Sequence, residues 1–418
     1  MSTIRAIKAR ETLDGRGIPT LEVIVWIQDG RSVIVSVPTD LTYTSHQAKA
    51  LRDNDQQEFN GMGVKKAIQN VNEVIGPQLL GMSTMQQAQV DQKLLQLDTS
   101  KDHSQLGANA LLGVSMAVMK AGALSVNLPL YSYIQQKYQL SDYARIPSCI
   151  YNIIDGGNFG NGNLDFQEFQ IIPASHINFP TSIAMASTIK QKMIDVIESK
   201  GGNVCTGPLG GFLPRMNSNK NVFELILEAV KTTTYTYAQD VFFGFDAAAD
   251  DFATDSKYNL RDQQNSYSAD SLLEFYSNIR ESYKTIYVED PFVRKDSKAW
   301  QKITKNMGAT TKIAADHLLS GDLEELKKSI KDKVANTLVV KLLNRATISE
   351  TIQLIKVAQD ANWSVVISQH PGETNEDFLV DLAVGVGANY VKFGPPNRGE
   401  KIAKYNRMIR IQEEVGEE

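Results

Sequence analysis

The spacing of apolar residues changes partway along this chain of 418 residues. Residues 4–37 alternate apolar and polar positions between turns at DGRG and QDGRS, a pattern typical of an antiparallel meander with TLEVIVWI as its clearest strand. Residues 62–97 and 105–124 instead carry apolar residues at helical spacing. We therefore predict an amino-terminal α+β domain over residues 1–135.

From about residue 147 onward, short Val/Ile-rich runs alternate with helical patterns. Two of the helical segments are SADSLLEFYSNIRESY and ISETIQLIKVAQDAN, and a strand, WSVVIS, follows the second. This βα repeat predicts an α/β fold in which parallel strands close into a barrel. We assign the barrel to residues 136–418.

Five of these apolar runs end in a charged residue. They are FFGFD at Asp246, IYVE at Glu289, KIAAD at Asp316, LVVK at Lys341 and NYVK at Lys392. Barrel enzymes hold their catalytic residues at the carboxyl ends of the strands. Because a buried charge without a partner is costly, these side chains need one another or a metal ion. We expect all five to lie together at one end of the barrel.

The composition restricts the partners and the compartment. Lys and Arg total 43 against 48 Asp and Glu, so the formal net charge of −5 argues against a nucleic acid or an anionic membrane as a main partner. A charged amino terminus and the lack of a long apolar run predict neither a signal peptide nor a membrane span. With Cys149 and Cys205 as the only cysteines, a disulfide framework is excluded and a cytoplasmic protein is favoured.

The charged strand ends also indicate a chemistry. Two aspartates and a glutamate suit Mg²⁺ rather than Zn²⁺, because all their donor atoms are oxygens. A cation flanked by two lysines suits a small carboxylate or phosphorylated carboxylate substrate. One lysine would remove the α-proton if nearby positive charge lowered its pKa, and the metal would hold the enediolate. The alternative is a ring of ion pairs that only fills the barrel mouth.

Long stretches spread over nearly the whole chain resemble the enolase family. They are ARETLDGRGIPTLEV, SQLGANALLGVSMAV, LPLYSYI, NIIDGG, DFQEFQIIP, LGGFLP, VEDPF, AADHL, PGET, DLAVG and KIAKYNRMIRIQEE. The resemblance implies an enolase-type (β/α)8 barrel with an amino-terminal α+β capping domain. It also implies a homodimer, because Arg10, Glu22, Arg410 and Glu413 match residues that pair across the family's dimer interface.

The resemblance assigns roles to individual residues. The Mg²⁺ ligands fall on Asp246, Glu289 and Asp316, the base on Lys341, the carboxylate contact on Lys392, and a catalytic glutamate on Glu168 with Gln167 beside it. Thr42 takes the place of the family serine that ligates a second Mg²⁺. His317 follows a ligand and is expected to point away from the site.

Other residues depart from the enolase pattern. Leu209, in Pro-Leu-Gly-Gly, replaces the glutamate that is the family's general acid, and leucine has no proton to donate. Phe159 replaces a histidine. The family segment Ser-His-Arg-Ser-Gly-Glu reads Ser-Gln-His-Pro-Gly-Glu over residues 368–373, so a phosphate-binding arginine becomes His370. We expect His370 near the substrate, where it and Arg345 would restore part of the missing positive charge.

The kept and missing groups leave three interpretations open. The first is a divergent enolase-like lyase or isomerase that keeps Mg²⁺ and Lys341 for α-proton abstraction. It would be impaired in interconverting 2-phosphoglycerate and phosphoenolpyruvate, because loss of a general acid costs ~10²–10⁴ in rate. The second is a non-catalytic paralogue with a structural or interaction role. The third is a weak glycolytic phosphopyruvate hydratase in which Glu168 or water replaces the acid.

Overall fold

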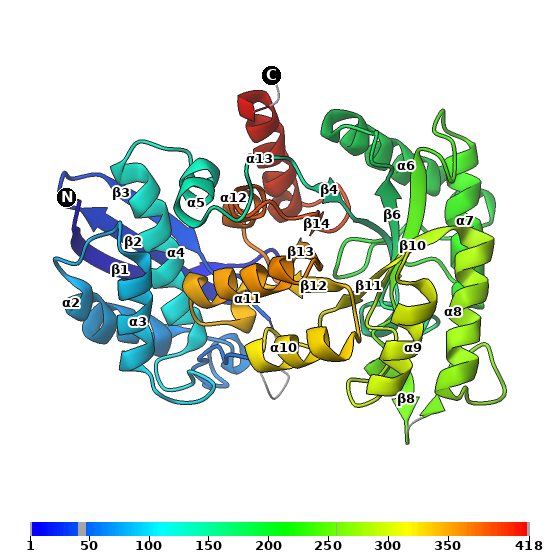
Figure 1. Ribbon diagram of the computed structural model, residues 1–418, viewed down its shortest axis with the longest axis horizontal. Helices are drawn as coiled ribbons and strands as arrows, with labels where there is room; N and C mark the ends of the chain where they lie inside the picture. The colour runs from blue at the N-terminus through cyan, green and yellow to red at the C-terminus, as the bar shows by residue number, and fades with distance from the viewer. Residues whose placement is uncertain (1, 41–46, 256, 416–418) are drawn as a thin grey trace.

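The computed structural model describes residues 2–40, 47–255 and 257–415. Its amino-terminal part, blue to cyan in Figure 1, lies to one side of a barrel that runs from green to red. A three-stranded antiparallel sheet with the order β1-β2-β3 forms the base of the amino-terminal part. Its strands are β1 (Ile4–Leu13), β2 (Pro19–Ile27) and β3 (Ser32–Ser36). The predicted meander is therefore confirmed.

The helix α4 (Ala108–Ser125) packs on this sheet. A Cβ added at Gly113 would come within 2.9 Å of Val23 and Val37, so the absent side chain lets α4 approach the strands closely. Of the described helices, α4 alone is long and apolar enough to cross a membrane, but 83% of its apolar window is buried inside the protein. It is thus placed as a core helix.

The predicted helix over residues 62–97 is wrong as one element. It is divided into α1 (Lys65–Gln69), a π-helical turn η2 (Asn70–Ile75), α2 (Gly76–Leu79) and α3 (Gln87–Leu97). The short turn η1 (Phe59–Gly61) precedes it, and α5 (Leu130–Tyr138) follows α4. The break has a backbone cause. Gly81 adopts a φ of +79°, and its N–H donates to the carbonyl of Ile4 at 2.9 Å, so this segment pairs with the first strand.

The barrel sheet has the strand order β4-β14-β13-β12-β11-β10-β7-β6-β5. Its strands are β4 (Ser148–Cys149), β5 (Tyr151–Asp155), β6 (Glu168–Pro173), β7 (Val241–Asp246), β10 (Thr285–Glu289), β11 (Lys312–Ala315), β12 (Thr337–Val340), β13 (Ser364–Ser368) and β14 (Tyr390–Lys392). Only Ile150 separates β4 from β5, and these two strands stand at opposite ends of the order. The barrel is therefore closed, as predicted.

The helices of this part follow the strands in an α/β pattern. They are α6 (Phe179–Ser199), α7 (Asn219–Lys231), α8 (Ala269–Tyr283), α9 (Ser297–Met307), α10 (Leu323–Asp332), α11 (Ile348–Asp360), α12 (Phe378–Gly385) and α13 (Gly399–Val415). The short helical turns are η3 (Gly157–Phe159), η4 (Ala249–Phe252) and η5 (Leu342–Asn344). A small hairpin consists of β8 (Ala253–Thr254) and β9 (Lys257–Tyr258). Side-chain caps fix several starts: Asn178, Ser268 and Thr347 each accept a backbone N–H of the first turn.

One strand corrects the expectation of a wholly parallel barrel. β6 runs antiparallel to both β5 and β7. A parallel return needs a long crossover, whereas the described segment between β5 and β6 contains only the short turn η3. As a result Glu168, the first residue of β6, lies beside Asp155 and Asp246, the last residues of its two neighbours. The reversal thereby adds Glu168 to the acids at the carboxyl end of the barrel.

Candidate active site

The charged strand ends lie together at one end of the barrel, as their spacing predicts. Lys392 of β14 reaches across to the last residues of β10 and β7, with its Nζ 2.7 Å from Glu289 Oε1 and 3.2 Å from Asp246 Oδ2. Lys341, which follows β12, lies 2.5 Å from Asp316 Oδ2. All five side chains are at most 12% exposed. Lys341 therefore neutralises an acid that follows the neighbouring strand β11, whereas Lys392 neutralises acids on the far side of the barrel.

These ion pairs raise the pKa of both lysines. Burial tends to lower the pKa of the Lys341 ammonium group, but the charge of Asp316 outweighs it, and the pKa lies above its ordinary value. Lys392 behaves alike, because Glu168, Glu289 and Asp246 outweigh burial and raise its pKa. The sequence interpretation required a lowered pKa for the base. In the arrangement described, both lysines are charged.

The acids fit a divalent cation. Asp316 Oδ1 is buried without a hydrogen-bond partner, which is unfavourable for a carboxylate unless an ion or water occupies the space beside it. With every group ionised, four carboxylates outnumber two ammonium groups by two charges; the groups are Glu168, Asp246, Glu289, Asp316, Lys341 and Lys392. An all-oxygen donor set with this excess suits Mg²⁺.

The sequence reasoning missed Asp290, which joins both clusters of possible ligand atoms. These clusters are Asp246–Glu289–Asp290 and Asp290–Asp316–His317, and within each the atoms lie within 4.8 Å of one another. Asp290 accepts the backbone N–H of Asp316 at 3.1 Å and of His317 at 2.8 Å. Its carboxylate therefore holds the chain that follows β11 in place. The adjacent acids in VEDPF were the available signal.

A cavity of about 420 Å³ opens above these charges. Lys341, Lys392, Glu168 and Gln167 line it, and its apolar lining residues include Phe159, Leu209 and Pro371. Gln167 donates to Asp246 Oδ2 at 3.1 Å, and Gln170 donates to Glu168 Oε2 at 3.0 Å. His317 also lines the cavity, so the expectation that it points away is wrong. Thr42 lies outside the described residues.

The loop that carries Leu209 is fixed by Asp155, the last residue of β5. Asp155 accepts the backbone N–H of Leu209 at 2.9 Å and of Gly211 at 3.0 Å. A Cβ at Gly211 would overlap the Asp155 carboxylate, so glycine is required for the loop to close over it. Burial and the charge of Glu168 raise the pKa of Asp155 to about 7. Leu209 is thus held firmly at the cavity wall.

His370 lies at the cavity wall after β13. Its Nε2 accepts the backbone N–H of Leu343 at 3.0 Å, and its Nδ1 lies 3.2 Å from Asp40 Oδ2. Because Nε2 is an acceptor, these partners assign the ring proton to Nδ1, which donates to Asp40. Arg345 donates to the carbonyl of Gly321 and is not among the described residues that line the cavity. Neither residue presents an uncommitted positive charge there.

A closed barrel with acids and lysines at the carboxyl ends of its strands, beside an α+β domain, defines a capped TIM-barrel protein with a metal-type site. The sequence model "Enolase, N-terminal domain" matches residues 4–134, and "Enolase, C-terminal TIM barrel domain" matches residues 143–418. The chain belongs to the enolase family. Membership implies an enolase-like function and a divalent metal, typically Mg²⁺, and the described acids are able to hold one.

Proposed function

We propose that this protein removes the α-proton of a carboxylate substrate and is impaired in interconverting 2-phosphoglycerate and phosphoenolpyruvate. One observation carries the proposal: Lys341, Lys392 and the acids share a single cavity whose remaining wall includes Leu209 and Phe159. Groups for taking a proton and holding a carboxylate are among its lining residues. Leu209, at the position of the family's general acid, offers only apolar carbon to a leaving hydroxyl that needs a proton.

Each retained residue has a task in this scheme. Asp246, Glu289 and Asp316 would hold Mg²⁺, which when bound would supply positive charge to stabilise an enediolate. Lys341 first releases its ammonium proton to solvent, when the charge of Asp316 no longer holds that proton, and the neutral amine then accepts the α-proton of the substrate. Lys392 contacts the substrate carboxylate, and its present ion pair with Glu289 is weakened as a result.

The step for which a residue is missing is the expulsion of the leaving hydroxide. Glu168 accepts a hydrogen bond from Gln170 at 3.0 Å and lies 3.8 Å from Lys392 Nζ, so it is already occupied by these two donors. Leu209 carries no proton to donate. Expulsion of hydroxide is therefore unassisted by an acid at that wall, and the overall dehydration is slow.

The test is exchange of the α-proton with solvent. In D₂O with Mg²⁺, wild-type protein should replace the α-proton of 2-phosphoglycerate or glycerate by deuterium, measured by loss of the ¹H NMR signal. Lys341→Ala should abolish exchange, while Lys327→Ala, which removes an exposed lysine paired with Glu324, should not. Exchange that is equal in wild type and Lys341→Ala, with both folded, would contradict the proposal.

A second candidate, the non-catalytic paralogue, has one observation in its favour. Lys341 and Lys392 already pair with Asp316, Glu289 and Asp246, so the charged mouth is internally compensated as a structural element would be. Under that function neither 2-phosphoglycerate nor glycerate exchanges a proton. Phosphoenolpyruvate formation well above the rate in Mg²⁺ buffer would instead favour the weak hydratase.

We also propose a homodimer in the cytoplasm. The family is often dimeric, and Arg10 and Glu22, which are partners across β1 and β2, pair at 2.5 Å on the surface of the amino-terminal sheet. Arg410 lies 3.4 Å from Asp377 of its own chain and is 55% exposed, so it has room for a second partner. Light scattering of the purified protein decides the oligomeric state, and a monomeric mass at micromolar concentration would refute the dimer.

A further inference from the structure

We propose that the cavity at the amino ends of the barrel strands binds a small monocarboxylate that carries an apolar group. Its volume is about 610 Å³, within the range of roughly 300–1,000 Å³ that small-molecule sites occupy. Residues from the starts of four strands line it: Ser148 of β4, Phe242 of β7, Ile286 of β10 and Tyr390 of β14. This cavity is therefore at the end of the barrel opposite to the charged strand ends, and the inference does not depend on the proposed function.

The cavity carries one positive charge that no acid compensates. Arg145 is exposed, and it is the only charged residue among the described residues that line the cavity. Within the described part of the chain, its guanidinium group makes one long hydrogen bond, from Nη2 to the carbonyl of Gly387 at 3.5 Å, and no ion pair with an acid. A guanidinium group in this state can bind a carboxylate through two parallel N–H donors. The charge therefore favours an anionic ligand.

Two side-chain amides that line the cavity add neutral donors. Asn389 Oδ1 accepts the backbone N–H of Val365 at 2.9 Å, and Asn178 Oδ1 accepts the backbone N–H of Thr181 at 3.0 Å. Because both amide oxygens already accept a backbone N–H, the unused hydrogen-bonding group of each amide is its NH₂, which only donates. Neither NH₂ has an acceptor among the residues that the structure describes. A ligand with acceptor oxygens, such as a carboxylate, matches these donors.

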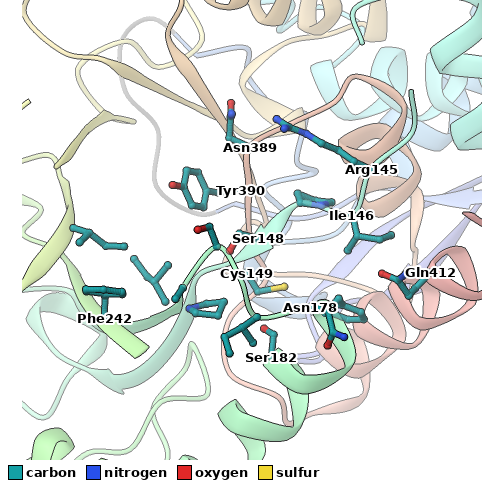
Figure 2. Close-up of a pocket in the computed structure, with 18 residues that line it drawn as sticks. Arg145, Ile146, Ser148, Cys149, Asn178, Ser182, Phe242, Asn389, Tyr390 and Gln412 are labelled. Carbon is teal, nitrogen blue, oxygen red and sulfur yellow. The ribbon is translucent and has the colours of Figure 1, made fainter. Parts of the chain in front are cut away.

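Tyr390 supplies a third neutral donor close to Arg145. Its hydroxyl has no hydrogen-bond partner in the described ranges of the chain. Burial raises the pKa of this hydroxyl, and the nearby charge of Arg145 only partly opposes the rise, so the hydroxyl stays protonated and able to donate. Figure 2 shows the Arg145 side chain directed toward Asn389, which precedes Tyr390 in the chain. These three side chains are therefore placed to share one carboxylate.

Buried apolar side chains of the lining fit the apolar group of the ligand. Ile172 packs in the same buried apolar cluster as Ile150, and Ile286 packs against that cluster. Ile172 is 1% exposed whereas Arg145 is exposed, so a ligand would carry its charge at the opening of the cavity and its apolar group toward the barrel interior. Contact with the buried side chains removes the apolar group from water and adds to the affinity. A phosphate dianion is a poorer match, because the described lining offers it a single cation.

The experiment uses 3-phenylpropionate as the probe, titrated with the full-length protein and followed by ligand-observed NMR. Wild type should bind it with a Kd of about 1 mM or lower. Propionate lacks the phenyl group and 3-phenylpropanamide lacks the charge, so each should bind at least about tenfold more weakly. Absence of binding at about 10 mM probe, or equal binding of the amide, would overturn the proposal.

Variants show whether the probe occupies this cavity. Arg145→Gln should weaken binding by about tenfold because it removes the charge, and Tyr390→Phe by about threefold because it removes one donor. Arg294→Gln is the matched control: it removes an arginine from the lining of the cavity at the mouth and should change the affinity by less than about twofold.

Circular dichroism verifies the folding of each variant, and Tyr390→Phe decides the outcome if Arg145→Gln does not fold. Unchanged binding in the folded variants of this cavity, or an equal loss in Arg294→Gln, would place the probe elsewhere and overturn the proposal. Neither result bears on proton abstraction at the mouth, which is measured by deuterium exchange.

Discussion

The barrel has a cavity at each end, and the two cavities differ both in size and in the chemistry of the residues that line them. The cavity at the amino ends of the strands is the larger, about 610 Å³ against about 420 Å³. Figure 2 shows its labelled polar residues, among them Arg145, Ser148, Asn178 and Tyr390. Of the described residues that line it, none is an aspartate or glutamate. The acids that could hold a metal ion, and the two lysines beside them, lie at the smaller cavity.

The difference shows that volume alone does not identify the reactive end of a barrel. Between the cavities lies an apolar layer of Ile150, Ile172, Tyr287, Ala314, Val339 and Val366. The one thiol lining the larger cavity, Cys149, is buried, and burial raises its pKa to about 12, so it stays protonated and unreactive. The two ends are thus separate environments, and three of the four predictions below match a variant at the mouth with a change at the other end.

The largest expected effect concerns metal affinity. Asp316→Asn removes a ligand charge beside the unpartnered Oδ1, and we expect Mg²⁺ affinity to fall by more than about 100-fold, because even outer partners of ligands are worth 10–100-fold. Arg145→Gln, at the other cavity, should leave the affinity unchanged. Calorimetric Mg²⁺ titration measures both. An equal loss in both variants would show that the two ends are not independent.

A smaller effect is expected from restoring an acid. Leu209→Glu places a carboxyl group at the wall that Asp155 fixes, and phosphoenolpyruvate formation from 2-phosphoglycerate should rise by about tenfold or more. Leu209→Gln has the same shape without a transferable proton and should give no gain. A coupled assay measures the rate. If glutamine raises the rate as much as glutamate, the missing acid is not what limits the reaction.

The third prediction concerns stability. Tyr287 belongs to the apolar layer, yet its hydroxyl donates to Glu289 Oε2 at 2.6 Å. Tyr287→Phe leaves that buried carboxylate short of a donor, so the free energy of unfolding should fall by about 1–3 kcal/mol. Tyr390→Phe, in the larger cavity, should cost less than about 0.5 kcal/mol. Urea denaturation compares them, and equal losses would remove the distinction.

The smallest effect is a slope with pH, and its sign should differ between the ends. Asp155 at the mouth has its pKa raised to about 7 by burial and by Glu168, so the folded state binds more protons than the unfolded state between about pH 4 and 7. The free energy of unfolding therefore falls as pH rises through that window, and Asp155→Asn should flatten the slope.

Asp240, just before β7 at the opposite end, supplies the contrast. Its pKa is lowered by the backbone N–H of Thr236 and by His176, so its contribution is present at neutral pH and is lost as pH falls below the ordinary aspartate value. Thermal melts of Asp155→Asn and Asp240→Asn from about pH 2 to about pH 8 cover both windows and test this. Slopes of the same sign in the two difference curves would refute the assignment.

Much of the fold was predictable, because strand ends and helical spacing are local properties of the sequence. The runs that end at Asp246, Glu289 and Lys392 predicted both the barrel strands and their shared mouth. The reversal of β6 was not predicted, since direction depends on the connection, although the described part between residues 155 and 168 has no long helix as a signal.

The site residues could be predicted only where a charged residue ends or follows an apolar strand. The contact between His370 and Asp40 joins residues 330 positions apart, and no local pattern indicates it. The raised pKa of Lys341 likewise depends on burial and on which acid its ammonium group meets in three dimensions, here Asp316. The sequence shows which ionisable residues are present. Their charge states depend on burial and on their neighbours in the folded protein, and these could not be predicted from the sequence.

The shortest barrel strand has a consequence for synthesis on the ribosome. Ser148 and Cys149 of β4 pair only with Tyr390 and Val391 of β14, 242 residues later in each case. At typical translation rates that wait is on the order of tens of seconds. Strands β1–β3 lie within the first 36 residues and can pair at once. The nascent chain therefore passes through a period as an open sheet with exposed edges, when binding by a chaperone would protect it from aggregation.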